Sequence, residues 1–347
     1  MVMWHLNREI FEQPRVLAEL IKAEQDNAAR VAEKIRRHGV RYIVIAARGS
    51  SGNAATYGKY LFAALNRFPV ALATPSLFTI YHSPPNLKDA LVIGISQSGE
   101  STDIVEVVAE AREQGALTLA VTNRPASPLA RTAEHLLLCH AGEERSIAAT
   151  KTYTTQLVAL ALLAVALAGD EKRLTDLKAL PQAMEQTLAL ERVVSAAVER
   201  YRSMKTCVVI GRGYNYATAL EMALKLKELT YVVAEPYSAA DFMHGPIAIV
   251  EQSFPAIVVA PSGQVFGNVY ALAEVLHRKE TKLVVISDRE EVLALAKTPL
   301  RLPISVEEWL SPIICVVPGQ LFTHHLTLAK GYDPDHPRGL RKVTVTR

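Results

Sequence analysis

The sequence predicts an α/β protein built from two copies of one unit. Short runs rich in Val and Ile alternate along the chain with small-residue turns and helix-length amphipathic segments, which is the pattern of a parallel sheet covered by helices on both faces. The chain has 347 residues, a little more than twice a typical domain of ~150 residues. Several dipeptides also recur at one fixed spacing, which favours duplication of a single α/β unit.

The predicted elements follow one another in a regular order. A polar opening segment over residues 15–38 has the apolar spacing of an amphipathic helix. The apolar runs that we predict to be strands lie at residues 42–47, 90–95, 117–121, 207–210, 256–260 and 283–286. Each run is short enough for a strand, and each is followed by a turn and then by a longer amphipathic stretch.

The internal repeat has one fixed offset in residue number: Arg48-Gly49 recurs as Arg212-Gly213, and Ser98-Gly99 recurs as Ser262-Gly263. The same offset relates Leu129-Ala130 to Leu293-Ala294, Glu143-Glu144 to Glu307-Glu308 and Gln156-Leu157 to Gln320-Leu321. We therefore expect an N-terminal helical segment (1–35), a first domain (36–170), a linker helix (171–194), a second domain (195–335) and a C-terminal tail (336–347) that reaches the active site.

The composition excludes several classes of protein. Half of the residues are hydrophobic, 21% are charged and the formal net charge is +3, so the chain is globular and has no basic footprint for nucleic acid or a membrane surface. Cys139, Cys207 and Cys315 have neither zinc-site nor disulfide spacing, which predicts a reducing, cytoplasmic setting. We expect no signal peptide, because Arg8, Glu9 and Glu12 stand where it would need an apolar core. We also expect no membrane span, because the longest apolar run, 157–168, is shorter than the ~20 residues that cross a bilayer.

Two turns carry the candidate ligand-binding residues, because ligands of open parallel sheets bind beyond the carboxyl ends of the strands. The first turn, 48–53, contains Gly49, Ser50 and Ser51, and the second reads Ser96-Gln97-Ser98-Gly99-Glu100-Ser101-Thr102 before a helix that begins near Asp103. Hydroxyls supply donors, and the amides at the start of a helix favour an anion. A simple N-cap would explain Ser101 or Thr102. Because a cap explains only one of the hydroxyls, we interpret the turns as a phosphate cradle.

The second copy lacks such a cradle. Its corresponding turns read Arg212-Gly213-Tyr214-Asn215-Tyr216 and Pro261-Ser262-Gly263-Gln264, which have lost nearly all the hydroxyls. We therefore expect one cradle per chain. Neither turn of the first copy has the GxGxxG or GxxxxGK pattern of a dinucleotide or nucleotide site, so the sequence indicates no large cofactor.

The second copy carries candidate acid and base groups. Glu221, Lys225 and Glu228 are spaced by four and three residues, so they share one helical face, which would otherwise be a solvated salt-bridge face. His244 follows in a loop-like segment. Moving a proton between C1 and C2 of an open-chain sugar needs a carboxylate base, an imidazole to open the ring and a cation beside the oxyanion. Glu228, His244 and Lys225 supply these groups. Lys342 lies either in a frayed terminus or close enough to form an imine or hydrogen bond with the substrate.

These residues lie in motifs that resemble the double sugar-isomerase (SIS) domain family. The motifs are Glu9-Ile10, Glu12-Gln13-Pro14, the turn 49–51, Ser96-Gln97-Ser98-Gly99-Glu100, Ala149-Thr150-Lys151, Thr154-Thr155-Gln156, Ala223-Leu224-Lys225-Leu226-Lys227-Glu228, His244-Gly245-Pro246 and the Lys342 tail. Over essentially its whole length the chain is similar to the isomerase half of glucosamine-6-phosphate synthase and to the family's stand-alone glucosamine-6-phosphate deaminases. The resemblance implies two tandem SIS domains, each a flavodoxin-like three-layer α/β/α sandwich with a parallel sheet.

The resemblance also implies roles for individual residues. Glu228 would move the proton between C1 and C2, Lys225 would support the enolate oxygen, and His244 would assist ring opening from the neighbouring subunit of a homodimer. Lys342 would reach the open-chain sugar phosphate. The implied substrate-binding residues are Gly49, Ser50, Ser51, Ser96, Gln97, Ser98, Ser101, Thr102, Ile147, Ala149 and Arg341. No metal or redox cofactor is expected, because the carbonyl of the substrate is itself the electron sink.

Departures from the family pattern leave the reaction open. Ala149 replaces a family serine, and Arg341 replaces a small residue beside the terminal lysine. The chain begins Met1-Val2-Met3, without the cysteine of the synthase's glutaminase, so we expect that glutamine is not its nitrogen source. The tail 340–344 resembles the deaminases, whereas Glu100 resembles the synthase.

The predicted reaction is therefore conversion of glucosamine 6-phosphate and water into fructose 6-phosphate and ammonia through an enolamine. The alternatives are a fructosamine-6-phosphate deglycase, a synthase-like isomerase that lacks a glutaminase, and a phosphosugar-sensing module that binds without turnover. The sensors of this family usually carry a helix-turn-helix, and the residues before the first predicted strand contain no basic recognition helix.

Overall fold

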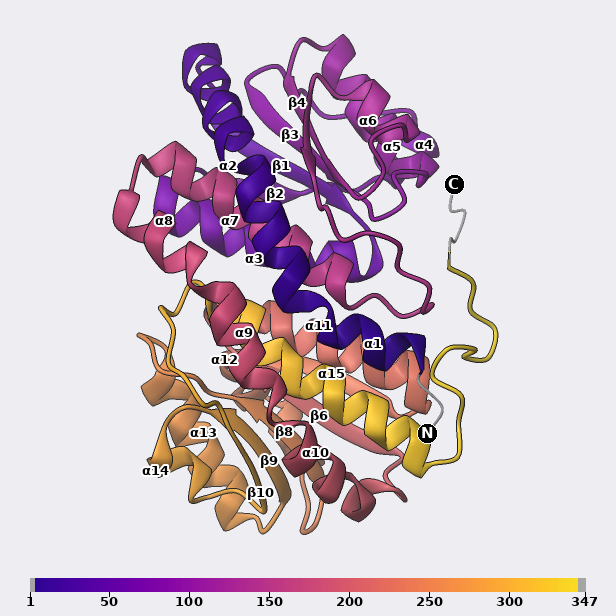
Figure 1. Ribbon diagram of the computed structural model, residues 1–347, viewed down its shortest axis with the longest axis vertical. Helices are drawn as coiled ribbons and strands as arrows, with labels where there is room; N and C mark the ends of the chain where they lie inside the picture. Colours follow the sequence, from indigo (N-terminus) through magenta and orange to yellow (C-terminus); the bar gives the residue numbers. More distant parts are fainter. Residues whose placement is uncertain (1–3, 343–347) are drawn as a thin grey trace. The chain divides into compact units, whose positions relative to one another are not determined.

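The structure is a computed structural model, and it describes residues 4–342. The described chain divides into two compact units (Figure 1). The amino-terminal unit contains residues 15–144, 151–179 and 341–342, and the carboxyl-terminal unit contains residues 4–14, 145–150 and 180–340. The opening helix and the segment 145–150 therefore belong to the unit that is formed mainly by the second half of the chain.

The amino-terminal unit is a five-stranded parallel sheet in the order β2-β1-β3-β4-β5. Its strands are β1 (Tyr42–Ala47), β2 (Val70–Leu72), β3 (Ala90–Ile95), β4 (Leu117–Thr122) and β5 (His135–Leu138). Its helices are α2 (Gln13–His38), α3 (Gly49–Asn66), α4 (Ser76–Thr79), α5 (Thr102–Glu113), α6 (Pro128–Thr132), α7 (Lys151–Ala168) and α8 (Glu171–Lys178).

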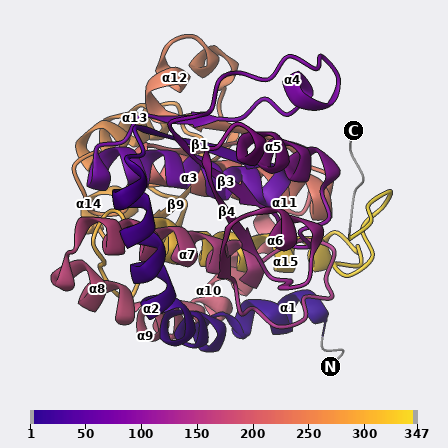
Figure 2. The same cartoon turned by 90° about the horizontal axis from the view of Figure 1, so that it is seen from above.

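Helices cover both faces of this sheet because successive strand residues point to opposite faces. Val44 and Val92 pack against Val108 of α5, in a cluster that also contains Leu129 of α6. On the other face, Gly58 of α3 lies against Ile45, and α3 packs on α7. Figures 1 and 2 show the strands between these two pairs of helices. The unit is thus a three-layer α/β/α sandwich.

The carboxyl-terminal unit has a five-stranded parallel sheet in the order β10-β9-β8-β6-β7. Its strands are β6 (Thr206–Gly211), β7 (Val233–Ser238), β8 (Pro255–Val259), β9 (Lys282–Ser287) and β10 (Thr298–Arg301). Its α-helices are α1 (His5–Phe11), α9 (Leu180–Leu188), α10 (Glu191–Ala197), α11 (Tyr216–Thr230), α12 (Ala239–Met243), α13 (Phe266–Arg278), α14 (Glu290–Leu293) and α15 (Ser311–Ala329), and its 3-10 helices are η1 (Val198–Tyr201), η2 (Gly213–Asn215) and η3 (Pro246–Ile249).

The two sheets confirm the predicted duplication. If the strands of each sheet are numbered from one to five along the chain, both sheets have the spatial order 2-1-3-4-5. The first strands of the two sheets begin at Tyr42 and Thr206, and the helices that follow their third strands begin at Thr102 and Phe266. Both pairs are separated by the offset at which the dipeptides recur. The fold class predicted from the sequence is therefore confirmed, with two tandem parallel-sheet units.

All six predicted strands are present, with bounds that differ by no more than one residue. The four strands that the sequence analysis missed are β2, β5, β7 and β10, and all four lie at the edges of the two sheets. Edge strands are short and half solvated, and β7 and β10 each contain a proline that a central strand would exclude. Where one linker helix was predicted over 171–194, three helices form (α8, α9 and α10). The break between α8 and α9 falls just before Pro181, which cannot continue the helix before it.

Within the described residues, one helix is long and apolar enough to cross a membrane. This helix, α7, has a mean hydropathy of 1.4 over 18 residues, but 83% of that window is buried in the structure. It packs against α3 of its own unit. Burial on this scale is what the central helix of a folded unit shows, so the length and hydropathy of α7 give little support for a membrane span.

Burial of a histidine on α15 predicts a pH-dependent stability. His324 is 2% exposed, and burial, followed by the neighbouring His325, lowers its pKa to about 4. Because the unfolded chain takes up this proton near pH 6.5, the folded state loses stability as the pH falls from about 6.5 to about 4, by at most ~1.4 kcal/mol per pH unit for one group. His324→Gln should flatten this part of the profile, measured as the free energy of unfolding in urea between pH 7.5 and 5.

The exposed His5 provides a matched control. His5→Gln should keep the wild-type dependence on pH. An unchanged slope in His324→Gln would contradict the burial argument.

Candidate active site

The two predicted ligand-binding turns lie at adjacent strand ends. Strands β1 and β3 are neighbours in the sheet, and Ala47 at the end of β1 is paired with Ile95 at the end of β3. The turn that begins at Arg48 therefore lies next to the turn that begins at Ser96. In this strand order, the first and third strands form the switch point at which ligands of doubly wound sheets bind.

The second turn gathers serine hydroxyls around backbone amides. Ser96 Oγ accepts a hydrogen bond from the Gly99 amide at 3.1 Å and lies 3.2 Å from Ser101 Oγ. Ser98 Oγ accepts from the Glu100 amide at 3.2 Å, and its own proton has no acceptor among the described residues. A hydroxyl held in this way can donate to an anion, because its lone pair is already engaged by the backbone.

A glycine is required in this turn. Gly99 has a φ of +65°, and a Cβ there would lie 2.1 Å from Ser127 Oγ and 3.0 Å from Thr122 Oγ1. Any other residue at position 99 would therefore place its Cβ against these side chains. It would also have to adopt the left-handed backbone conformation, which residues other than glycine rarely do. The turn is held by a hydrogen bond from the Leu129 amide to the Gly99 carbonyl at 3.0 Å.

The simple capping alternative does not account for Ser101. This residue occupies the N-cap position of α5, but its side chain makes no capping hydrogen bond. Its Oγ lies against Ser96 Oγ, part of the serine cluster. Thr102 is the first residue of α5 and is exposed, and Gln97 is half-buried between Ser96 and Ser98. The hydroxyls of this turn are therefore arranged around one another at the start of the helix.

The first turn adds groups from α3. Gly49 and Ser50 open α3, and Ser51, 8% exposed, accepts a hydrogen bond from Gln156 Nε2 of α7 at 3.0 Å. The sequence analysis did not include Gln156 among the site residues. Gln156 lies 105 residues further along the chain, so spacing gave no signal for this contact.

A cation also lies at this strand end. Arg48 Nε donates to Asp103 Oδ2 at 2.8 Å, and the Asp103 side chain is fully buried in the first turn of α5. The Arg48 side chain remains 52% exposed. The sequence analysis placed Arg48 in the turn without giving it a role, and its position directly after an apolar run was the signal that could have identified it. The pair supplies a fixed guanidinium next to the serine cluster, where an anion would need a counter-charge.

Burial overturns the solvated-face interpretation of α11. Glu221 is fully buried and Lys225 is 3% exposed, whereas the Glu228 side chain is 23% exposed. Lys225 Nζ is hydrogen-bonded to Glu228 Oε2 and lies 3.7 Å from Glu221 Oε1. The three groups form a buried triad in which one ammonium serves two carboxylates. Glu228 is the member that solvent or a ligand can reach.

His244 lies beyond the carboxyl end of β7, whereas Glu228 lies before its amino end. Glu228 is in the last turn of α11, just before β7, which begins at Val233. His244 follows β7 and α12 and is exposed. Strand β7 has six residues, which span about 20 Å at ~3.3 Å per residue. Within one chain, His244 and Glu228 therefore lie at opposite ends of a strand.

Two further predicted segments are held by buried glutamates. Glu9 of α1, 3% exposed, accepts hydrogen bonds from the Ser146 amide and hydroxyl, and this fixes the segment 145–150, in which Ile147 and Ala149 are half-buried. In the amino-terminal unit, Glu144 Oε2 accepts from Lys342 Nζ at 2.9 Å and from Thr152 Oγ1 at 2.6 Å.

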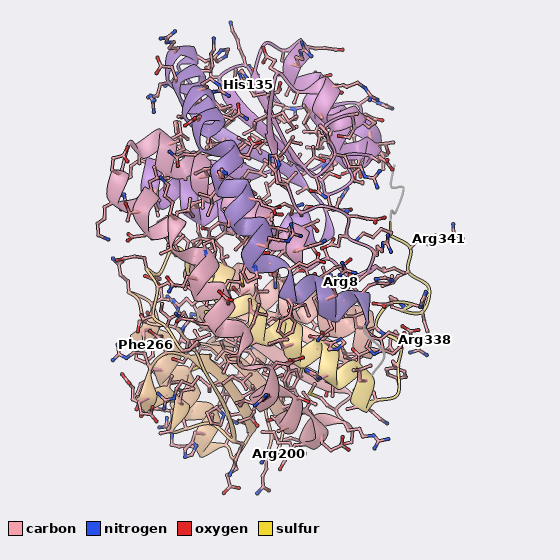
Figure 3. The ribbon with its side chains drawn as sticks, viewed as in Figure 1. Arg8, His135, Arg200, Phe266, Arg338 and Arg341 are labelled. Atoms are coloured by element: carbon pink, nitrogen blue, oxygen red, sulfur yellow. The ribbon has the colours of Figure 1, made fainter. Side chains whose placement is uncertain are left out.

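The structure therefore places the candidate lysine Lys342 beside a buried carboxylate. Its neighbour Arg341 is exposed (Figure 3). The sequence analysis named both buried glutamates, Glu9 in a family motif and Glu144 in the repeat, but gave neither of them a place in the site.

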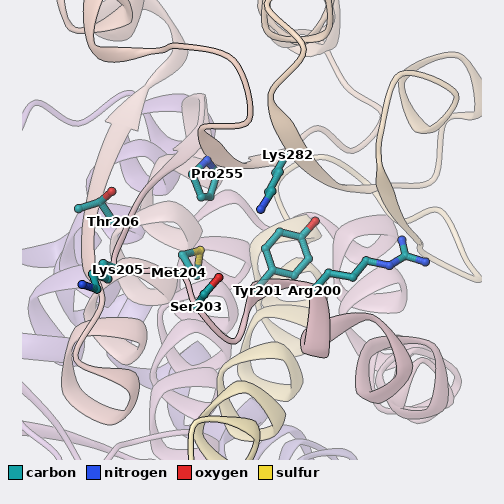
Figure 4. Close-up of a pocket in the computed structure, with 8 residues that line it drawn as sticks. All are labelled: Arg200, Tyr201, Ser203, Met204, Lys205, Thr206, Pro255 and Lys282. Carbon is teal, nitrogen blue, oxygen red and sulfur yellow. The ribbon is translucent and has the colours of Figure 1, made fainter.

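One hollow in the carboxyl-terminal unit lies away from the predicted site residues. It has a volume of about 190 Å³ and lies at the amino ends of β6, β8 and β9, and its lining residues are Arg200, Tyr201, Ser203, Met204, Lys205, Thr206, Pro255 and Lys282 (Figure 4). This lining contains three cations but neither a carboxylate nor an imidazole.

The predicted site residues thus form two groups in the structure. The serine turn and Ser51 belong to the amino-terminal unit, and the Glu221-Lys225-Glu228 triad with His244 belongs to the carboxyl-terminal unit. Across residues 4–342, no three His, Cys, Asp or Glu side chains are grouped as a metal site would require.

Comparison with known proteins identifies the family. The model of the SIS domain matches residues 38–166 and again residues 200–330. The chain is 38% identical over 349 residues to the isomerizing glutamine-fructose-6-phosphate aminotransferase of Thermococcus kodakarensis, and 36% identical over 344 residues to that of Pyrococcus horikoshii. Both matches cover 97% of this chain but 57% of the relative. The chain thus spans less than two thirds of the length of these relatives.

Solved structures agree with this result. A candidate phosphosugar isomerase from Silicibacter pomeroyi DSS-3 is 32% identical with a TM-score of 0.87, and the match covers 96% of this chain and 100% of that one. The C-terminal domain of glucosamine-fructose-6-phosphate aminotransferase from Francisella tularensis is 27% identical with a TM-score of 0.86, covering 97% and 99%. The glucosamine-6-phosphate deaminase of Thermotoga maritima, at 20% identity and a TM-score of 0.79, shares the fold.

The two matches of the family model, together with the doubled sheet, define the class: the chain belongs to the SIS domain family and carries the domain twice. The resemblance inferred from the sequence motifs is confirmed. The two relatives compared above are named as isomerizing glutamine-fructose-6-phosphate aminotransferases.

Proposed function

We propose that the protein is an aldose-ketose isomerase of amino-sugar phosphates, and that it converts glucosamine 6-phosphate and water into fructose 6-phosphate and ammonia. The observation that carries the proposal is the α11 triad: a partly exposed carboxylate, Glu228, is hydrogen-bonded to an ammonium that a second, fully buried carboxylate also holds. Such a carboxylate is fixed in place and remains accessible, as a base that acts on carbon must be.

The phosphate end of the substrate would lie in the serine turn. The Ser96, Ser98 and Ser101 hydroxyls, Ser51 and the first amides of α5 supply donors at the β1/β3 switch point. Gln97, Gly49, Ser50 and Thr102 border the same turns. Arg48, held by Asp103, would offset part of the charge of the dianion.

The chemistry needs only proton transfers and water. Glu228 would take the proton from C2 of the open-chain aldehyde, giving an enolamine whose oxygen the Lys225 ammonium would stabilise. Returning the proton to C1 leaves an imine at C2, and water adds to this carbon and displaces ammonia to give fructose 6-phosphate. The carbonyl of the substrate accepts the electron pair, so no metal or redox cofactor takes part. Lys342, Arg341, Ile147 and Ala149 would contact the sugar.

Ring opening by His244 would involve a second copy of the chain. In one chain His244 and Glu228 lie at opposite ends of β7, so a single substrate could not meet both from the same copy. His244 itself is exposed, so a second copy of the chain could reach it. We therefore propose a homodimer in which each site takes His244 from the partner. We also propose that the protein acts in the cytoplasm.

The direct test of function is to incubate the protein with glucosamine 6-phosphate and to measure ammonia and fructose 6-phosphate. Glu228→Gln should lower kcat by about 10²–10⁴-fold and change KM little, because the phosphate turn is intact. Glu251→Gln, an exposed glutamate of the same unit, should retain wild-type kcat.

Other substrates distinguish the alternatives. Product from fructoselysine 6-phosphate alone would indicate a deglycase. Because a catalyst accelerates both directions, the two directions must be compared by rate. A kcat for forming glucosamine 6-phosphate from fructose 6-phosphate and ammonia that exceeds the kcat for its breakdown would indicate the synthase-like isomerase that the aminotransferase relatives favour. A wild-type protein that binds these sugars and converts none of them would contradict the proposal and indicate a sensor.

The shared site has its own test. Co-expression of Glu228→Gln with His244→Ala should restore activity to about a quarter of wild type, because half of the randomly mixed dimers would contain one site with both groups intact. Each variant alone should be nearly inactive. If both groups act within one chain, every site in the mixture is damaged and no activity returns.

A further inference from the structure

The segment that follows α15 lies against the end of α11, the helix that carries Glu228. Arg338 of this segment (Figure 3) lies over the ring of Tyr231, with its guanidinium carbon 3.6 Å from the ring centroid, and the Arg338 amide donates to Tyr231 Oη at 2.9 Å. Tyr231 is the residue directly after α11 and lies three positions beyond Glu228. Two contacts of one residue pair therefore fix the segment to the chain close to the candidate base.

A second aromatic ring supports the same contact. Tyr332 packs edge-on against Tyr231, with ring centroids 4.8 Å apart, and the Arg338 guanidinium lies 5.9 Å from the Tyr332 centroid. Among residues 4–342, Arg338 makes no ion pair with a carboxylate. Its charge is therefore directed to the ring of Tyr231, whose quadrupole attracts a cation.

The same segment is also held in its middle. The Asp335 carboxylate accepts hydrogen bonds from the amides of His5 at 2.8 Å and Leu6 at 3.0 Å, at the start of α1, and these two amides have no partner within the helix. Pro334 and Pro337 are buried, and each fixes its own backbone φ. We call residues 332–338 the tail anchor, because a segment held and stiffened in this way loses little further entropy when it is ordered.

Lys342 follows the tail anchor closely along the chain. Four residues of extended chain span at most about 14 Å, so the position of Arg338 limits the space that Lys342 can reach. In the amino-terminal unit, Lys342 Nζ donates to Glu144 Oε2 at 2.9 Å, and the Lys342 side chain is 27% exposed. An amine on a short tether has a high effective concentration near the point where the tether is fixed.

We propose that Arg338 is a positioning residue of the sugar site: stacked on Tyr231, it holds the chain so that the Lys342 amine can reach the open-chain sugar. Arg338 acts through Lys342 and does not itself contact the reacting atoms. Without the stack, the tether of Lys342 would begin further back, at Asp335, and the amine would be spread over a larger volume. This inference rests on the proposed function in assigning Lys342 to the sugar.

The test is a double-mutant cycle on the full-length chain, read as kcat/KM for glucosamine 6-phosphate. Arg338→Ala should lower kcat/KM about two- to five-fold when Lys342 is present, because an exposed cation–π contact and the length of a tether act on this scale. In a Lys342→Met background, Arg338→Ala should cause no further loss. Equal losses in both backgrounds would show a merely structural role, and no loss in either would show no role. Both results would overturn the proposal.

Two control variants separate positioning from a general effect of removing an exposed arginine. Arg289→Ala removes a similar stack of the same unit, in which the guanidinium carbon lies 4.6 Å from the ring centroid of Phe266, and it should keep the wild-type kcat/KM. Arg338→Lys keeps a cation beside Tyr231 and should recover part of the loss. A loss in Arg289→Ala as large as that in Arg338→Ala would contradict the proposal.

Failure of the proposed function would be seen separately. If wild type converts none of the sugar phosphates, the four proteins of the cycle are compared by their Kd for glucosamine 6-phosphate, measured by calorimetry. Binding that is about two- to five-fold weaker in Arg338→Ala, but unchanged by this substitution in the Lys342→Met background, would support the inference although the proposed reaction fails. Equal Kd values in wild type and Arg338→Ala would overturn the inference, and a wild type that does not bind the sugar would overturn both.

Discussion

The pairing of β1 with β3 is the constraint on which the candidate ligand-binding turn depends. These strands are neighbours in the sheet but not in the chain, so the helices that follow them, α3 and α5, leave toward opposite faces. The ends of the two strands are thereby left side by side and uncovered by either helix. Serine hydroxyls from both turns and the first amides of α5 meet there, and a buried aspartate fixes an arginine beside them.

The two copies of the sheet carry different polar groups at corresponding places. The first copy keeps the hydroxyls of the serine turn, and the second copy places Glu308 in the corresponding turn. The second copy also buries a lysine between two carboxylates on α11. Burying this charge is costly unless its partners stay with it, and the two carboxylates lie on the same helix as the lysine. A stable sheet thus supports a polar triad with one accessible carboxylate.

The sequence predicts the inner part of this fold well and its edges poorly. The central strands are continuous apolar runs because both of their faces are covered, whereas β7 and β10 carry prolines and polar residues that hide the strand pattern. The serine turn could be predicted because it follows a central strand. The burial of Glu221 and Lys225 could not, since helical spacing shows which residues share a face but not whether another helix covers it.

Contacts between residues distant in sequence were also beyond prediction. Gln156 bonds Ser51, Asp103 bonds Arg48 and Glu144 bonds Lys342, over separations of 105, 55 and 198 residues. No local pattern marks such partners. The dipeptide repeat did include Gln156 and Glu144, but as markers of duplication, because a repeated residue carries no sign of what its side chain contacts.

The most direct measurement is a crystal structure of the Glu228→Gln protein with glucosamine 6-phosphate bound. The account predicts phosphate oxygens hydrogen-bonded to the Ser96, Ser98 and Ser101 hydroxyls, with C2 of the open-chain sugar about 3–3.5 Å from the side chain at position 228. A phosphate bound elsewhere, or a C2 atom more than about 10 Å from that side chain in every pairing of subunits, beyond any hydrogen-bond reach, would contradict it.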